Sequence, residues 1–204
     1  MGVFSPDSSK LFTYRLDTRE VGKLQVLQTV PGSRPVVHSY SHPLPGDAQI
    51  AKAELMVFEL GSGARVDLAR PPAPVAATYD SLVQEEMKWN AKGTRVYYIE
   101  SDRGYKTTAL HMADARTGKD SVLLQERSDT YVAPSPILRP VGNGETVIWS
   151  SERDGWNHLY LVDGNGDGIK RQLTSGPWVV FDVAHVDAGR RWVYFTAEIG
   201  RAHV

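Results

Sequence analysis

Residues 151–161, SERDGWNHLYL, decide the fold of this chain, because they contain two strand-forming segments separated by a tight polar turn. A hairpin segment at residues 162–168 follows directly, and residues 172–174 continue with QLT. The same layout occurs three more times along the chain. The sequence therefore predicts a repeat architecture built from small antiparallel sheets.

The four units align on their turns, each of which follows a short strand and precedes an apolar strand. The turns are residues 5–8 (SPDS), 90–93 (NAKG), 141–144 (VGNG) and 186–189 (VDAG). Runs rich in β-branched and aromatic residues come next, at residues 11–14, 95–99, 146–149 and 192–195. Such residues are enriched in strands, so we assign these runs as the second strand of each unit.

Third strands are predicted at residues 55–60, 108–113 and 158–162, and short fourth strands at residues 64–68, 121–125 and 170–173. The loops that join them, residues 61–63, 115–118 and 163–168, all contain glycine, which supplies the positive φ of tight turns. Four antiparallel strands in units of roughly 40 to 50 residues are typical of β-propeller blades.

The fold class predicted for residues 1–197 is all-β, a partial β-propeller of about three and a half four-stranded antiparallel blades. The second and third units are regular, an insertion at residues 18–53 interrupts the first, and the fourth unit stops after its second strand. Propellers close with about four to eight blades, so we expect an incomplete ring with an unpaired strand edge at each end.

The composition is that of a globular chain and excludes several classes of function. The 204 residues carry a net charge of −1, with 41% hydrophobic residues, 23% charged residues and no cysteine. Without a basic patch we predict no nucleic-acid partner, and without an apolar run of about 18 residues we predict no membrane span. The lack of cysteine excludes disulfides and thiolate catalysis. No cofactor is expected.

Five segments, in order along the chain, resemble the dipeptidyl peptidase IV family of the prolyl oligopeptidase superfamily. They are residues 4–7 (FSPD), 11–16 (LFTYRL), 40–47 (YSHPLPGD), 151–161 and 172–178 (QLTSGPW). The resemblance implies the N-terminal propeller of a serine exopeptidase that releases dipeptides, often Xaa-Pro or Xaa-Ala, from peptide substrates. In that family the propeller controls access to an α/β-hydrolase domain of the same parent chain. Bacterial relatives are usually periplasmic or secreted, so the resemblance implies a periplasmic or secreted location.

The insertion at residues 18–53 contains four prolines, Pro31, Pro35, Pro43 and Pro45. Proline interrupts ladder pairing, so we predict an extended excursion from the blade. The resemblance implies that such a segment reaches the neighbouring domain or a partner subunit, which makes a homodimer through the insertion one expectation. A solvated surface loop without a partner is the alternative.

The sequence contains no G-x-S-x-G nucleophile elbow, which a serine hydrolase of this superfamily needs. The nearest string, Gly61-Ser62-Gly63, is interpreted as a hairpin between two blade strands. The histidines do not form the motif of a zinc-binding helix, and we assign no triad and no metal site to them. They are His38, His42, His111, His158, His185 and His203. We expect His158 to be a strand histidine that is hydrogen-bonded to its neighbours.

Glu85 and Glu86 form an acidic pair shortly before Trp89. The resemblance implies that two glutamates on the propeller hold the α-ammonium group of the substrate, but the family's pair lies upstream of the region that matches Val3. We therefore interpret Glu85 and Glu86 as the start of a strand, and we expect the substrate-binding pair upstream of this chain.

Residues 163–168 (DGNGDG) resemble the first half of a calcium loop, but its twelfth position is Thr174 instead of glutamate, so a hairpin tip is favoured. Arg153 and Asp154 are assigned to the turn between two strands, and Trp156 is predicted to pack between blades; a binding patch is the alternative.

Tyr131 and Val132 match the region where the family lines its extended substrate pocket, although the family's arginine is missing beside them. We assign no catalytic, substrate-binding, cofactor-binding or metal-binding residue.

Residues 198–204, EIGRAHV, break the fourth unit abruptly. They correspond to the translation of GAGATCGGAAGAGCACACGTC, which contains a common sequencing adapter. We interpret this segment as an artefact, so Arg201 and His203 carry no functional prediction.

Two other functions stay open, a protein-binding propeller of the TolB-like kind and a catalytically inactive member of the same family. The segment at residues 40–47, inside a long insertion, favours the peptidase family over a simple propeller.

Overall fold

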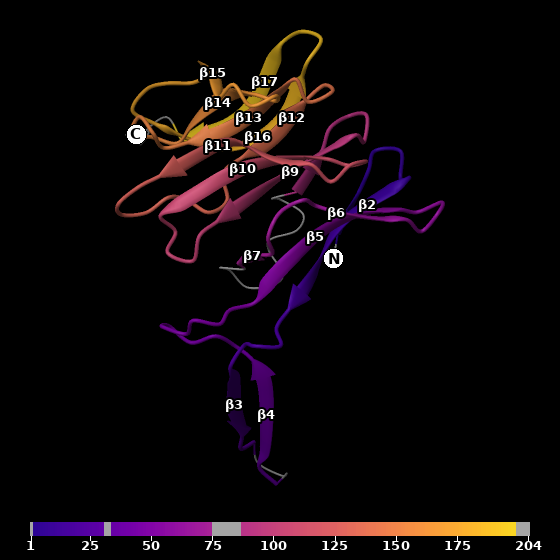
Figure 1. Cartoon of the computed structure of the whole chain (residues 1–204). Coiled ribbons are helices and arrows are strands. Elements are labelled where there is room, and N and C mark those ends of the chain that lie inside the picture. Colours follow the sequence, from indigo (N-terminus) through magenta and orange to yellow (C-terminus); the bar gives the residue numbers. More distant parts are fainter. Residues whose placement is uncertain (1, 31–33, 75–86, 199–204) are drawn as a thin grey trace.

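The computed structural model of the chain describes residues 2–30, 34–74 and 87–198. All regular elements within these ranges are β-strands, which form four consecutive sheets and one projecting hairpin (Figure 1). We call the sheets blades I to IV in chain order. The predicted all-β class and the division into blades are confirmed.

Blade I contains the predicted second and third strands as a long antiparallel pair, with Lys10 opposite Glu59 at one end and Asp17 opposite Lys52 at the other. The sheet order is β1–β2–β5–β6, and β7 pairs with β5. The strands are β1 Gly2–Phe4, β2 Lys10–Asp17, β5 Lys52–Glu59, β6 Arg65–Asp67 and β7 Ala73–Pro74. The short strand β7 was not predicted. The insertion leaves the blade where a β2–β5 turn would stand.

Blades II and III are complete four-stranded antiparallel sheets in sequential order. Blade II consists of β8 Met87–Trp89, β9 Arg95–Ser101, β10 Thr107–Asp114 and β11 Asp120–Arg127. Blade III consists of β12 Leu138–Val141, β13 Thr146–Ser151, β14 His158–Asp163 and β15 Ile169–Gln172. Each predicted strand of these two units is confirmed, with ends that differ by a few residues.

Blade IV contributes two strands, β16 Val179–Asp187 and β17 Trp192–Glu198. They form an antiparallel pair with register shifts between Val180 and Asp182 and between Val183 and His185. Within the described residues the fourth unit consists of this pair of strands.

Strand β9 illustrates why the sequences of the blade strands are almost continuously apolar. Val96 and Tyr98 point into a core shared with Phe12 of blade I, whereas Tyr97 points into a core shared with Trp149 of blade III. Successive side chains alternate between the two faces of a strand, and both faces of this blade are covered. Each large apolar side chain buried in this way contributes about 1.5–3 kcal/mol to folding.

The turn before β13 is built for close contact between blades II and III. Tyr97 Oη donates a hydrogen bond to the carbonyl oxygen of Gly144 at 3.0 Å. Gly144 has a φ of +89°, and a Cβ atom at this position would lie 2.1 Å from Tyr97 Oη. Only glycine fits both the backbone conformation and the approach of the neighbouring blade.

The insertion forms a regular hairpin of β3 Lys23–Gln28 and β4 Val36–Ser41, which projects from blade I (Figure 1). The prediction that prolines interrupt ladder pairing is wrong for these two strands. Pro35 lies immediately before β4, and Pro43 and Pro45 lie after it. Because these prolines are outside β4, they do not interrupt its pairing with β3. Pro31 lies outside the described residues. No helix in the described ranges has the length and apolar character required to cross a bilayer.

Candidate functional site

A cavity of about 500 Å³ opens between blades II and III. Its lining comes from the end of β11, the connection to β12 and the turn between β13 and β14. Tyr131 and Val132 lie in that connection, and Arg153 lies in the turn. The structure therefore brings the segment of Tyr131 and Val132 together with Arg153, which the sequence did not connect.

Glu126 of β11 is the polar joint beneath this cavity. Its Oε1 atom accepts hydrogen bonds from Trp149 Nε1 and Arg153 Nη2, both at 2.8 Å, and its Oε2 atom accepts one from Ser151 Oγ at 2.9 Å. All three donors belong to blade III. A carboxylate that accepts this many bonds holds its donors in fixed positions, so Glu126 connects the two blades and orients Arg153.

Arg153 is further fixed by the last residue of β13 and by an aromatic ring. Its Nε atom donates to Ser151 Oγ at 3.0 Å, and the guanidinium carbon lies 5.0 Å from the centroid of the Tyr160 ring. Burial, followed by the charge of the nearby Asp154 carboxylate, raises the pKa of Tyr160 to about 12. The hydrogen bonds to Ser151 and Glu126 and the contact with the Tyr160 ring therefore hold the Arg153 guanidinium in one orientation at the cavity.

One wall of the cavity comes from the segment 128–136, which connects β11 to β12. Tyr131 is 55% exposed in this wall, and its ring lies 6.1 Å from the ring of Tyr105. The cavity lining therefore combines an exposed aromatic ring with an oriented guanidinium. Such a site can contact an apolar group and also donate hydrogen bonds to carbonyl or carboxylate oxygens.

A second polar cluster joins blades I and II. Tyr98 Oη donates to Asp120 Oδ1 at 2.5 Å and accepts from Arg70 Nη1 at 2.8 Å. Arg70 Nη2 also donates to Glu100 Oε2. The His111 ring stacks on Tyr98 with the centroids 4.9 Å apart, and its Nδ1 atom lies 3.0 Å from Asp120 Oδ2.

The pKa shifts in this second cluster favour an ionised Asp120 carboxylate and a neutral Tyr98 phenol. Burial would raise the pKa of Asp120, but hydrogen bonds from His111 and Tyr98, together with the nearby positive charge, outweigh it and lower that pKa from its usual value. Burial and the hydrogen bond to Asp120 raise the pKa of Tyr98 well above its usual range. The polar groups are satisfied by one another, so we interpret the cluster as a joint between blades and not as an open site.

The other histidines lie apart from one another. His158 is buried, with Nδ1 3.0 Å from Thr174 Oγ1 and Nε2 2.9 Å from the carbonyl oxygen of Gly176, as expected for a hydrogen-bonded strand histidine. His38 contacts Gln28 in the insertion hairpin, and His185 packs near Tyr194 in blade IV. Among the described residues, no group of three or more histidine, aspartate and glutamate side chains is arranged to hold a metal ion.

Two candidate motifs are hairpin tips. Gly61-Ser62-Gly63 joins β5 to β6, and Gly63 has a φ of +72°. Residues 163–168 join β14 to β15, and Asp163 pairs with Lys170 and accepts a hydrogen bond from the Asn165 amide. The expected hairpin geometry is confirmed at both places.

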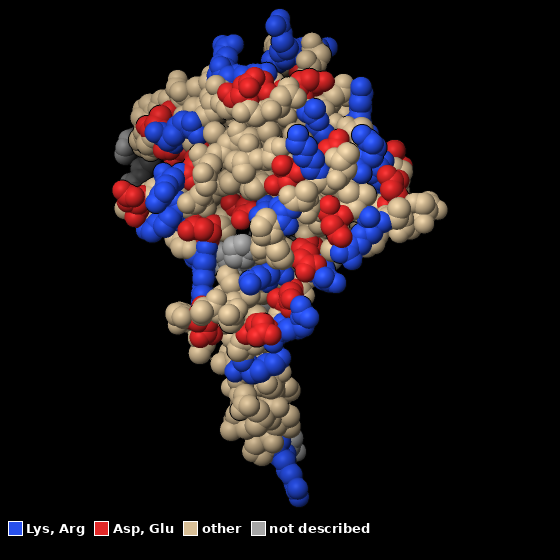
Figure 2. Space-filling view, in the orientation of Figure 1, with Lys and Arg blue, Asp and Glu red and all other residues tan. Residues whose placement is uncertain are grey.

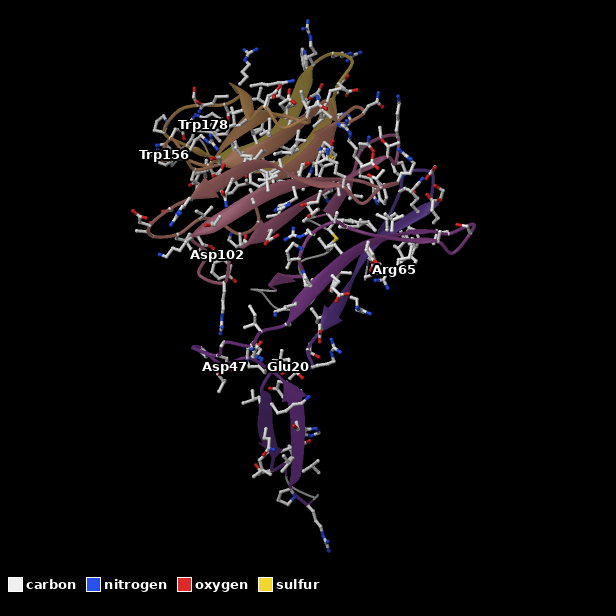
Figure 3. All side chains as sticks on the ribbon, viewed as in Figure 1. Glu20, Asp47, Arg65, Asp102, Trp156 and Trp178 are labelled. Atoms are coloured by element: carbon white, nitrogen blue, oxygen red, sulfur yellow. The ribbon has the colours of Figure 1, made fainter. Side chains whose placement is uncertain are left out.

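Trp156 does not pack between blades, so that prediction is wrong. The residue lies in the turn between β13 and β14 and is 44% exposed. Figure 3 shows Trp156 at the edge of the molecule. Trp149 and Trp178 occupy packed positions instead, because they belong to or directly precede the strands that face a neighbouring blade. Glu85, Glu86, Arg201 and His203 lie outside the described residues.

The insertion hairpin presents an exposed apolar surface. Its strands contribute Val26, Leu27, Val36, Val37 and Tyr40 as exposed large side chains. Figure 2 shows that the hairpin carries few charged side chains along its length, in contrast to the mixed charges over the blades. An apolar surface of this kind is typical of an interaction site.

Consecutive antiparallel sheets, of which blades II and III are complete four-stranded sheets, are the architecture of a partial propeller domain. The sequence profile of the family described as "Dipeptidyl peptidase IV (DPP IV) N-terminal region" matches residues 2–202. The chain belongs to this family.

Solved structures support the same fold. A putative dipeptidyl aminopeptidase IV from Bacteroides ovatus superposes with a TM-score of 0.78 at 24% identity, and covers 96% of this chain and 29% of that protein. The dipeptidyl peptidase 4 of Porphyromonas gingivalis superposes with a TM-score of 0.75 at 21% identity, over 95% of this chain and 26% of that one.

Among curated relatives, a probable dipeptidyl peptidase 4 of Emericella nidulans is 27% identical over 121 residues, which is 59% of this chain and 15% of the relative. A dipeptidyl peptidase 4 of Arthroderma otae is 28% identical over 125 residues, or 58% of this chain and 16% of the relative. The chain thus spans about one sixth of the length of these curated relatives.

Proposed function

We propose that this chain is the non-catalytic propeller part of a serine exopeptidase that releases N-terminal dipeptides, often Xaa-Pro or Xaa-Ala. Its role is to gate and position the peptide for an α/β-hydrolase domain of the same parent protein. The observation that carries the proposal is the family match across residues 2–202. The names of the similar proteins, all dipeptidyl peptidases or aminopeptidases, point to the same activity.

The cavity between blades II and III supports a role in peptide positioning. Arg153 is held by Glu126 and can donate hydrogen bonds to a peptide carbonyl, while Tyr131 offers an apolar contact in the same cavity. A peptide presents both kinds of group at regular intervals. Fixed donors and a rigid aromatic ring bind such a chain at low cost in side-chain entropy.

In the parent enzyme the chemistry is acyl transfer through a serine, with a histidine as base and an aspartate that orients it. We assign these groups to the hydrolase domain. We further propose that the apolar hairpin of β3 and β4 contacts a second copy of the protein, because burial of its exposed valine and leucine side chains would be favourable. The family resemblance also leads us to propose a periplasmic or secreted location.

The decisive experiment is to recover and sequence the DNA on both sides of this coding segment in its original source. The proposal predicts a paired glutamate codon upstream, and a G-x-S-x-G elbow followed by aspartate and histidine downstream. The assembled protein should then release p-nitroaniline from a Gly-Pro chromogenic substrate. Blades without a hydrolase would instead establish a protein-binding propeller, and a hydrolase without its serine would establish an inactive family member.

A further inference from the structure

The turn between β9 and β10, residues 102–106, is held in an unusual backbone conformation. Tyr105 has a φ of +51°, which is uncommon for a residue with a large side chain. Asp102 stabilises the turn, because its Oδ1 atom accepts hydrogen bonds from the amides of Lys106 at 2.7 Å and Thr107 at 2.8 Å. A conformation of this kind persists only where surrounding contacts determine it, and such positions cluster at functional sites.

On one side, this turn holds the outer wall of the cavity. The amide of Val132 donates to the carbonyl oxygen of Tyr105 at 2.7 Å, and the amide of Ser128 donates to that of Lys106 at 3.0 Å. Lys106 Nζ also donates to the carbonyl oxygens of Asp129, at 2.7 Å, and Thr130.

Within the described residues, the cavity lining includes Ser128, Tyr131 and Val132 but not Tyr105 or Lys106. The turn therefore supports the wall from behind.

On its other side, the same turn holds the base of the insertion. Arg103 Nη2 donates to the carbonyl oxygen of Leu44 at 2.8 Å, and Arg103 Nη1 donates to that of Asp47. The Asp47 side chain closes this loop by accepting a hydrogen bond from the Leu44 amide at 2.8 Å. Figure 3 shows the turn that carries Asp102 facing the part of the insertion that carries Asp47.

We propose that the turn of residues 102–106 is a positioning element that ties the wall of the cavity to the insertion, with Arg103 as the connecting residue. The proposal rests on the proposed function in one respect, namely that the cavity receives peptide. A partner seated on the insertion would then stabilise the wall that the peptide meets. Arg103 acts on the site through Tyr105 and Lys106, since it reaches the insertion and not the cavity.

Hydrogen exchange measured by mass spectrometry on the 204-residue chain tests this connection. In Arg103→Ala, we expect exchange to become about tenfold faster in residues 42–47 and also in residues 128–132, because the anchor of the turn is lost. In Lys106→Ala, hydrogen exchange should become faster in residues 128–132, while the exchange rate of residues 42–47 should stay unchanged. The matched control is Arg116→Ala, an exposed arginine in the β10–β11 turn of the same blade, which should leave both segments unchanged.

Faster exchange confined to residues 42–47 in Arg103→Ala would overturn the proposal. Arg103→Lys gives a second reading if the alanine variant fails to fold, because lysine keeps the charge but loses the planar fork that reaches two carbonyl oxygens. Arg103→Lys should make hydrogen exchange faster in both segments, but to a smaller degree than Arg103→Ala. Faster exchange in one segment alone would again refute the connection. The measurement requires no peptide and no hydrolase domain, so its outcome is independent of whether the parent protein is a peptidase.

Discussion

Replacing Glu126 by glutamine is expected to weaken the joint between blades II and III. Hydrogen bonds to a charged group contribute about 1.5–3 kcal/mol and neutral ones about 0.5–1.5 kcal/mol. Glutamine keeps one acceptor oxygen for Trp149 and Arg153 but replaces the oxygen that faces Ser151 with a donor. Because the Arg153 side chain is 36% exposed, solvent screens its share of the charge interaction.

We therefore expect Glu126→Gln to lower the free energy of unfolding by about 1–2 kcal/mol, which corresponds to a decrease in Tm of about 3–6 °C for a chain of this size. Glu126→Ala should cost about 3 kcal/mol, because the buried Trp149 indole N–H then lacks its acceptor and a small void opens.

Urea unfolding of the dilute chain at pH 7, followed by tryptophan fluorescence, measures both values. The control is Glu152→Gln, which removes an exposed carboxylate from the same cavity and should leave the midpoint unchanged. Equal urea midpoints for Glu126→Gln and Glu152→Gln would refute the role of Glu126 as a joint.

Three further outcomes are expected. The pKa of the Asp120 carboxyl is lower in the folded state than in the unfolded state, so the ionised carboxylate stabilises the fold fully above its unfolded pKa, and this contribution is lost as the pH falls through its folded pKa. The free energy of unfolding should therefore decrease below about pH 4. Urea titrations at several pH values should show a less steep decrease in Asp120→Asn. Residues 1–197 should bind a hydrophobic dye strongly, because Phe181 and Trp192 of blade IV are 61% and 60% exposed beside an open sheet edge, whereas dye fluorescence no higher than that of a compact monomer with a sharp melt would contradict this. The purified chain should not release p-nitroaniline from a Gly-Pro chromogenic substrate, and turnover above a buffer blank would overturn the assignment of catalysis to another domain.

Most of the strands could be predicted because their signal is local. The runs at residues 95–99 and 146–149 are rich in β-branched and aromatic residues, and the turns before them contain glycines, such as Gly93 and Gly144, with positive φ. Strand β7 escaped prediction because it is very short and contains Pro74. The insertion hairpin was not predicted, because a proline disrupts a ladder only where it lies within a paired strand, and the described prolines flank β4.

The candidate site could be predicted only in part. Tyr131 and Arg153 were both singled out, yet their convergence depends on how the connection after one blade meets the turn of the next. Trp156 was assigned to the interior because it is large and aromatic, but its turn lies outside the strand ladder and leaves it exposed. Burial of a turn residue depends on what the neighbouring blade covers.

The sequence by itself determined the strand repeat and the glycine-dependent turns, since these follow from side-chain alternation and backbone preference within a few residues. The family was indicated by a different signal, the resemblance of five segments in order along the chain. Only the tertiary structure decided that Glu126 joins two blades, that Arg70 reaches Glu100 and that Arg103 holds the insertion. These contacts connect residues about 25 to 60 positions apart, and no local pattern specifies them, because they arise only when separately formed sheets stack and must satisfy the polar groups that they bury.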